Sequence, residues 1–239
     1  MYRPRSYRRW VKGDGLIGFE VIEKETDLYI SASKNLECQA RVSLLTYRRS
    51  LESYAAGDNV FSVSLEPINV SQDAPLIVRA MAESSARAGV GPMAAVAGAI
   101  AEFVGRDLLK FSDEVIVENG GDIFLRTTKI RTMGIYAGED SPFTGKLALE
   151  IEPKEDGLGV CTSSGTVSHS LSFGSSDAVV IISEDTSLAD AVATAAGNIV
   201  KTAADIEKAI GFARSIEGVL GVLVVIKDKM GSWGEIKLV

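Results

Sequence analysis

Apolar and polar residues near the start of the chain follow first the period of a strand and then that of a helix. Apolar residues alternate or cluster at 17–23 and 27–31, on either side of the polar break Lys24-Glu25-Thr26, which predicts a β-hairpin. Apolar residues then recur at steps of four, three, four and three, at Ala40, Leu44, Tyr47, Leu51 and Tyr54. This spacing predicts one buried stripe on a helix that ends at Gly57.

The rest of the chain alternates between the two periods. Pro75 suits the first turn of a second helix that runs to about Ala88, and an alanine-rich helix follows at 93–104. Extended segments are predicted at 60–65, 114–118, 123–125, 133–137, 147–151, 178–182, 219–226 and 235–239, and further helices at 187–200 and 203–216. The turn Asn119-Gly120-Gly121-Asp122 is typical of a hairpin, because glycine readily adopts a positive φ. Together these elements predict an α+β fold.

The alanine-rich helix has a weak match later in the chain. Residues 94–104 and 190–200 are identical at Ala95/Ala191, Val96/Val192, Ala97/Ala193, Ala99/Ala195 and Val104/Val200, and residues 121–125 resemble 234–238. A duplication would make about 75–127 and 187–239 two helix-plus-hairpin units of a single domain, 1–239, packed about a pseudo-twofold axis with a ligand site between them. The alternative is a chance match between two alanine-rich helices.

Composition narrows the class of protein. The chain has 239 residues, 46% of them hydrophobic, and 25 basic against 32 acidic residues give a net charge of −7, which argues against general nucleic-acid binding. The basic start of the chain is not followed by the apolar region of a secretory signal, and no apolar window approaches the roughly 20 residues that cross a bilayer. We therefore expect a cytoplasmic protein with no membrane partner. Two cysteines cannot form a disulfide framework or a zinc site by themselves.

Three motifs are candidates for binding chemistry. Gly89-x-Gly91-x-x-Ala94 fits a dinucleotide fingerprint, but a helix precedes it where a strand is required, which favours a turn between helices. The turn at 119–122 would let a flat ligand approach the backbone. Asp190 and Thr194 lie one helical turn apart and present two oxygens suited to Mg²⁺. The alternative for Asp190 is a capping box with Ser187 at the N-cap.

A polar segment contains the one histidine of the sequence. Ser164 or Cys161 could pair with His169 as a nucleophile and base, but no nucleophile-elbow motif or fixed acid accompanies them. The alternative is a loop of hydrogen-bonding residues. Cys38, on the first predicted helix, is expected to act as a small apolar residue.

Four blocks resemble the ApbE superfamily, whose best-known members are Mg²⁺-dependent FAD:protein FMN transferases. They are AAVAGAIAE at 94–102, VENGGDI at 117–123, CTSSG at 161–165 and LADAVATA at 188–195. The complete pattern is most similar to an uncharacterised ApbE-related family of archaea and bacteria. The resemblance implies an ApbE-like fold, with Asp190 and Thr194 as side-chain ligands of Mg²⁺ and the carbonyl of Val96 or a neighbour as the main-chain ligand. It implies that FAD or FMN would contact Asn119, Gly120, Gly121, Asp122, Ser164 and Gly165.

The chain also departs from the transferase pattern. His169 corresponds to the histidine that opens the transferases' His-x-x-Asp-Pro-Arg-Thr-Gly segment, but here the segment continues as Ser170-Leu171-Ser172-Phe173-Gly174. Ala97 replaces the transferases' lysine. We therefore expect a protein that binds a small flat or anionic, flavin-like ligand between its two halves without efficient FMN transfer. The alternative is a Mg²⁺-dependent transferase with an acceptor protein as partner, in which His169 is the candidate catalytic residue.

Overall fold

The computed structural model describes residues 15–138, 141–165 and 173–239. Its strands are β1 (Ile17–Glu23), β2 (Thr26–Ala32), β3 (Val115–Asn119), β4 (Asp122–Arg126), β5 (Arg131–Gly134), β6 (Ala148–Ile151), β7 (Leu158–Ser163), β8 (Ala178–Ser183), β9 (Val219–Ile226) and β10 (Lys229–Gly234). Its helices are α1 (Glu37–Gly57), α2 (Asn59–Val63), α3 (Leu76–Ala88), α4 (Val96–Leu108), α5 (Thr186–Ile199) and α6 (Ile206–Arg214), with short 3₁₀ helices η2 (Pro92–Ala95) and η3 (Ala203–Asp205). The predicted α+β fold is confirmed.

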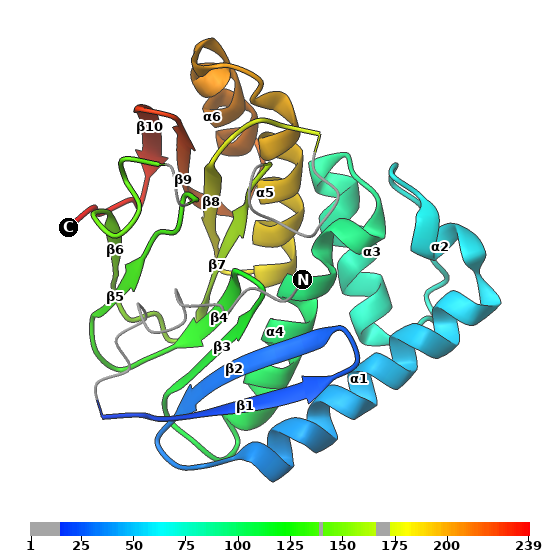
Figure 1. Ribbon diagram of the computed structural model, residues 1–239. Helices are drawn as coiled ribbons and strands as arrows, with labels where there is room; N and C mark the ends of the chain where they lie inside the picture. The colour runs from blue at the N-terminus through cyan, green and yellow to red at the C-terminus, as the bar shows by residue number, and fades with distance from the viewer. Residues whose placement is uncertain (1–14, 139–140, 166–172) are drawn as a thin grey trace.

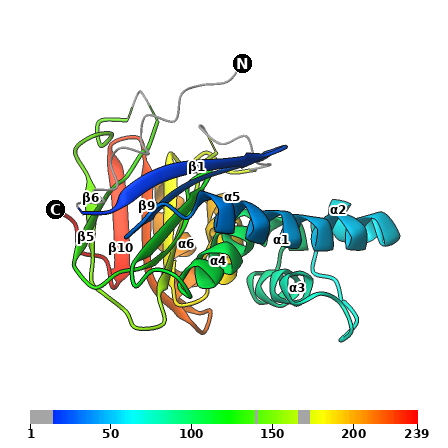
Figure 2. The same cartoon turned by 90° about the horizontal axis from the view of Figure 1, so that it is seen from below.

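Eight strands form one sheet in the order β1-β2-β3-β4-β7-β8-β9-β10, and every neighbouring pair is antiparallel. Helices α4, α5 and α6 pack against one face of this sheet, and α1 and α3 pack against those helices or the sheet's first edge (Figure 1). The small β5–β6 sheet lies on the opposite side of the large sheet (Figure 2). The helices and the small sheet thus cover opposite faces.

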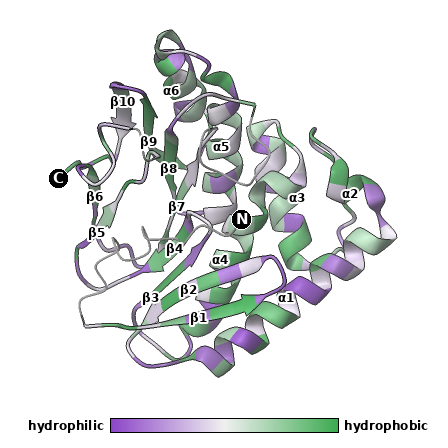
Figure 3. Cartoon of the chain, in the orientation of Figure 1, coloured by the Kyte–Doolittle hydropathy of each residue, from purple (hydrophilic) through white to green (hydrophobic). Residues whose placement is uncertain are grey.

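The alternation of side chains along the central strands produces two hydrophobic cores. On β4, Phe124 belongs to the core under the helices, whereas Ile123 and Leu125 belong to the core under β5–β6. On β7, Cys161 faces the helices and Val160 faces the small sheet. Because both faces of the sheet are covered, β8 and β9 are almost wholly apolar, as the hydropathy colouring shows (Figure 3).

Two predicted segments differ from the structure. Residues 60–65 were expected to be extended, but Asn59–Val63 is the helix α2, because the Asp58 side chain accepts hydrogen bonds from the amides of Val60 (3.0 Å) and Phe61 (3.3 Å). The last strand was expected at 235–239. Instead, Lys229–Gly234 forms β10, and the segment after it is joined to β6 by an isolated bridge between Leu149 and Leu238.

The strand order of the large sheet can be compared with the predicted pseudo-twofold axis. A twofold axis of the large sheet would exchange β4 with β7 and β1 with β10, so it cannot superpose the β3–β4 hairpin on the β9–β10 hairpin. In addition, the segment 234–238 that was matched to 121–125 contains only the last residue of β10, Gly234, and otherwise follows that strand. The pseudo-twofold arrangement is therefore not confirmed, and the duplication itself stays a prediction.

The glycine-rich segment at 89–94 joins two helices. Gly89 ends α3 in the left-handed conformation with φ 71°, and Gly91 precedes η2. This is the helix-to-helix turn that the sequence favoured over a dinucleotide loop. Within the described residues, no single helix is long and apolar enough to cross a membrane, and α3 with the segment Pro92–Leu108 passes that test only as a pair bent by 103°.

Candidate cation and ligand site

The β3–β4 hairpin brings two polar side chains to the helical face of the sheet. Its turn consists of Gly120 (φ 70°) and Gly121 (φ 107°), both with positive φ as the sequence predicts. Asn119 and Asp122 pair directly across the hairpin, and Asp122 shares the face of Phe124 because it lies two residues before it. Asn119 Nδ2 donates a hydrogen bond to the Ala97 carbonyl (3.0 Å). The hairpin is therefore tied to the first turn of α4.

Helices α4 and α5 meet in close contact at Gly98. The Gly98 amide donates a hydrogen bond to Asp190 Oδ2 (2.8 Å). A Cβ atom at Gly98 would collide with the Thr186 carbonyl and the Asp190 Cβ, so the contact requires glycine. Asp190 is 9% exposed and caps α4, whose own N-cap residue Ala95 makes no side-chain hydrogen bond.

The alternative capping role of Asp190 within its own helix is wrong. Helix α5 begins at Thr186, and its N-cap is Asp185, whose Oδ1 accepts a hydrogen bond from the Leu188 amide (2.9 Å). Ser187 is already inside the helix, so it cannot form the N-cap of a capping box with Asp190. The Asp190 carboxylate is therefore committed to α4 and not to the start of α5.

Acidic groups accumulate beside this contact. Asp122 and Cys161 pair directly across β4 and β7, and both are buried. Burial and the nearby carboxylate of Asp190 raise the pKa of Asp122 well above its ordinary value, and burial raises the pKa of Asp190 to about 7. Within the described part of the chain, no lysine or arginine forms an ion pair with Asp122 or Asp190. Among the described residues, no basic side chain therefore favours the charged form of these two carboxyl groups.

Thr194 lies one helical turn after Asp190 on α5 and is half-buried. Other helical hydroxyls bond back to a carbonyl four residues earlier, as Thr46 does to Val42 (2.9 Å) and Ser85 to Met81 (2.6 Å). Among the described residues, the Thr194 hydroxyl has no such partner. It is therefore available as an oxygen ligand next to Asp190.

These residues fit a hard cation held mainly by oxygen. Across the described ranges, no group of three or more His, Cys, Asp or Glu side chains converges as a metal site. Such a site would use one carboxylate, one hydroxyl and main-chain oxygens, with water completing the shell, as Mg²⁺ prefers. Val96, whose carbonyl is the predicted main-chain ligand, is the first residue of α4 and lies two positions before Gly98, whose amide donates to Asp190.

The other predicted ligand-binding residues lie at the end of β7. The segment 161–163 belongs to this strand and is not a loop, and Ser164 and Gly165 follow it. Gly165 donates its amide to the Ser176 carbonyl (2.9 Å), and a Cβ at Gly197 of α5 would lie 3.3 Å from the Ser163 hydroxyl. The end of β7 is thus close to the part of α5 that follows Thr194.

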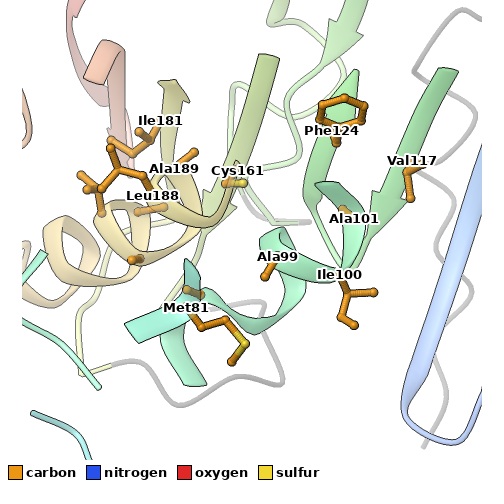
Figure 4. Close-up of a cluster of buried hydrophobic side chains, with 14 of the residues drawn as sticks. Met81, Ala99, Ile100, Ala101, Val117, Phe124, Cys161, Ile181, Leu188 and Ala189 are labelled. Atoms are coloured by element: carbon orange, nitrogen blue, oxygen red, sulfur yellow. The ribbon is translucent and has the colours of Figure 1, made fainter. Parts of the chain in front are cut away.

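The structure tests only part of the predicted nucleophile–base pairing. His169 lies outside the described residues, so its pairing with Ser164 or Cys161 stays a prediction. Cys161 belongs to the buried core between the sheet, α4 and α5 (Figure 4), and its thiol contacts the Thr186 carbonyl at 3.4 Å. Burial and the nearby Asp122 raise the pKa of the Cys161 thiol, which opposes a role as a nucleophile. Cys38 lies exposed on α1, so its role as a small apolar residue stays a prediction.

An open pocket of about 800 Å³ lies elsewhere, between the end of α1 and the start of α3. Its lining is Arg49, Ser50, Ser53, Tyr54, Gly57, Asp58 and Pro75. It contains none of the residues predicted to bind a cation or a flavin.

Comparison with known proteins places the chain in a family. The model of the family described as "AbpE bacteria" matches residues 8–230. A UPF0280 protein of Methanocella arvoryzae is 43% identical over 217 residues, which cover 89% of this chain and 86% of that protein. A UPF0280 protein of Methanococcus aeolicus is 41% identical over 220 residues, covering 90% of this chain and 86% of that protein.

Solved structures show the same fold at low sequence identity. The flavin transferase ApbE of Vibrio cholerae has a TM-score of 0.60 at 12% identity, covering 92% of this chain and 96% of that one. The apo form of the flavinyl transferase ApbE of Pseudomonas stutzeri has a TM-score of 0.58 at 14% identity, covering 92% and 94%. The chain therefore belongs to the family described as AbpE bacteria, and its fold is the ApbE fold.

Proposed function

We propose that this protein binds a divalent cation of the Mg²⁺ class through Asp190, Thr194 and a main-chain oxygen at Val96. The observation that carries the proposal is the state of Asp190, a buried carboxylate without a basic partner among the described residues. One of its oxygens accepts the Gly98 amide, which orients the carboxylate. The hydroxyl of Thr194, which has no hydrogen-bond partner among the described residues, lies one turn further along the same helix.

The ligand proposed beside the cation is flat and anionic, with a flavin nucleotide such as FAD or FMN as the model compound. Two features support this choice. The Gly120–Gly121 turn has no side chains that would keep a flat ring from the backbone, and two serines, Ser163 and Ser164, stand at the end of β7. The solved proteins that share the fold are named flavin transferases.

A bound cation would neutralise the charge of the ligand's phosphates. The residues of the chain would position the cation and the ligand. Asp190 and Thr194 fix the position of the cation, Asn119 holds the first turn of α4 in place through the Ala97 carbonyl, and Asp122 adds a second carboxyl beside Asp190. These contacts serve binding and orientation.

We further propose that the protein does not transfer FMN efficiently. In-line attack on a pyrophosphate requires the phosphates to be held on more than one side, and a cation holds them on one. The arginine of the transferase segment is missing from 169–174, and Ala97 stands in place of the transferases' lysine. The second candidate function, supported by the shared fold, is a Mg²⁺-dependent FAD:protein FMN transferase that acts on an acceptor protein.

The two functions differ in a direct assay. The protein would be titrated with FAD and FMN in the presence of Mg²⁺, and flavin fluorescence quenching would report binding. In parallel, it would be incubated with FAD, Mg²⁺ and an acceptor protein carrying a flavinylation sequence, followed by in-gel fluorescence. Flavin binding without covalent labelling supports the binding role. Strong labelling that Asp190→Ala abolishes supports the transferase.

A further inference from the structure

Helices α4 and α5 cap each other in a reciprocal way. The Gly98 amide of α4 donates to Asp190 Oδ2 of α5 at 2.8 Å, and the Thr186 amide of α5 donates to Glu102 Oε2 of α4 at 2.8 Å. Each acid lies four residues after the amide that its own helix donates, so the two hydrogen bonds form a matched pair across the contact. Asp190 therefore has a counterpart, Glu102, at the other end of the same interface.

The two acids differ in what neutralises them. Glu102 is 8% exposed, and its Oε1 accepts from Arg106 Nε (2.8 Å) and Nη2 (2.7 Å), one turn further along α4. Asp190 has Thr194 at the corresponding position of α5. The Arg106 guanidinium thus forms an ion pair with Glu102, whereas Asp190 has the hydroxyl of Thr194 at the corresponding position.

We propose that Glu102 is a positioning residue for the cation site, a role that rests on the proposed function. By holding the Thr186 amide, Glu102 fixes the start of α5 against α4. Asp190 and Thr194 lie one and two turns further along that helix, so the same bond sets their position relative to the first turn of α4. Two hydrogen bonds in opposite directions oppose sliding of one helix along the other.

Thr186, whose amide donates to Glu102, is tightly packed on both sides. A Cβ at Gly98 would collide with the Thr186 carbonyl, and a Cβ at Gly159 of β7 would collide with the backbone and side chain of Thr186. Thr186 is fully buried between α4 and the sheet, and its amide finds its acceptor in Glu102. Removal of that acceptor leaves a buried amide unsatisfied, which favours a shift of the start of α5. Mutation of residues that orient metal ligands without touching the metal typically lowers metal affinity by roughly 10- to 100-fold.

Three variants separate positioning from general stability. Glu102→Ala removes the acceptor of the Thr186 amide, and Glu102→Gln keeps a carbonyl oxygen for it while losing the charge. Arg106→Ala is the matched control, because it breaks the ion pair and leaves the Glu102–Thr186 hydrogen bond. Each variant of the full chain would be titrated with Mn²⁺ by calorimetry at a temperature at which circular dichroism shows it folded. Hydrogen exchange would follow the amides at the start of α5.

We expect Glu102→Ala to weaken Mn²⁺ binding by about 10-fold and to accelerate exchange at the start of α5. Glu102→Gln and Arg106→Ala should stay within about threefold of the wild-type affinity. Wild-type affinity in Glu102→Ala, or equal losses in the Ala and Gln variants, would overturn the positioning role while leaving the cation site intact. Wild-type protein that binds no Mn²⁺ would overturn the cation site itself.

Discussion

The Oδ2 atom of Asp190 lies 2.8 Å from the backbone nitrogen of Gly98, although the two residues are 92 positions apart in the sequence. This bond joins the start of α4 to the interior of α5. Thr194 follows Asp190 by one turn on the same helix. The cation site that we propose depends on this one contact between helices.

The close contact at Gly98 predicts that one added methyl group lowers the stability of the protein. Gly98→Ala should destabilise the protein by about 1–3 kcal/mol, because the new Cβ meets the Thr186 carbonyl. Gly211→Ala, in the middle of α6, is the matched control, because a Cβ there meets nothing within 4 Å and should stabilise the helix by about 0.5–1 kcal/mol. Denaturant unfolding measures both. Equal effects of the two substitutions would argue against the close helix contact.

The raised pKa of Asp190 predicts how stability depends on pH. Its pKa is about 7 in the folded protein, against a value of 3.8 for an unperturbed aspartate, so folding favours the protonated form. The stabilising contribution is complete below the unfolded pKa and is lost as pH rises toward 7, amounting to up to about 4 kcal/mol. Denaturant unfolding in the presence of a chelator should therefore show that wild type loses more stability than Asp190→Asn between pH 4.5 and pH 7.5. If the difference in unfolding free energy between the two proteins stayed constant over this range, the raised pKa would be contradicted.

The two cysteines should react at very different rates. Cys38 is exposed and Cys161 is fully buried with a raised thiol pKa, so its reactive thiolate is scarce and shielded. A thiol reagent should label one site quickly in native protein and the second at least about 100-fold more slowly, with full labelling in denaturant. Cys38→Ser should abolish the fast phase. Rapid labelling of that variant would show that Cys161 is accessible.

Local patterns in the sequence predicted much of the fold. The stripe from Ala40 to Tyr54 forms the buried side of α1, and the glycine turn at 120–121 joins β3 to β4 with both φ angles positive. Helix α2 was missed because its stability depends on a cap from Asp58 and on an edge-to-face contact between Tyr54 and Phe61, which do not appear in apolar periodicity. β10 was missed because most of its residues are exposed, so no apolar period indicates it.

The candidate site was predictable only in part. The four-residue spacing of Asp190 and Thr194 gives their shared helix face directly. The sequence cannot decide whether Asp190 caps its own helix, because Ser187 and Asp185 are both acceptable N-cap residues. The contacts of Asp190 with Gly98 and of Glu102 with Thr186 were also missed, since they link residues 92 and 84 positions apart. Alternation along β4 and β7 could have indicated that Asp122 and Cys161 share a face.

The hydroxyl of Thr194 is the second side-chain ligand that we propose, so its removal should weaken cation binding. Thr194→Val keeps the shape of the side chain and removes the hydroxyl, so the affinity for Mn²⁺ should fall by about 10-fold with little change in stability. Thr46→Val is the matched control, because Thr46 lies on α1 and its hydroxyl bonds to the Val42 carbonyl. Calorimetry on both variants checks the prediction. Unchanged affinity in Thr194→Val would remove this residue from the ligand set.

The most direct test of the cation site is calorimetric titration of the purified chain with Mg²⁺, compared with Asp190→Asn. The substitution keeps an oxygen that can accept the Gly98 amide and removes the charge that a cation requires. We predict that wild type binds one Mg²⁺ per chain and that Asp190→Asn, folded to the same extent by circular dichroism, binds it at least about 10-fold more weakly. Equal binding by the two proteins, or no binding by wild type, would contradict the proposed site.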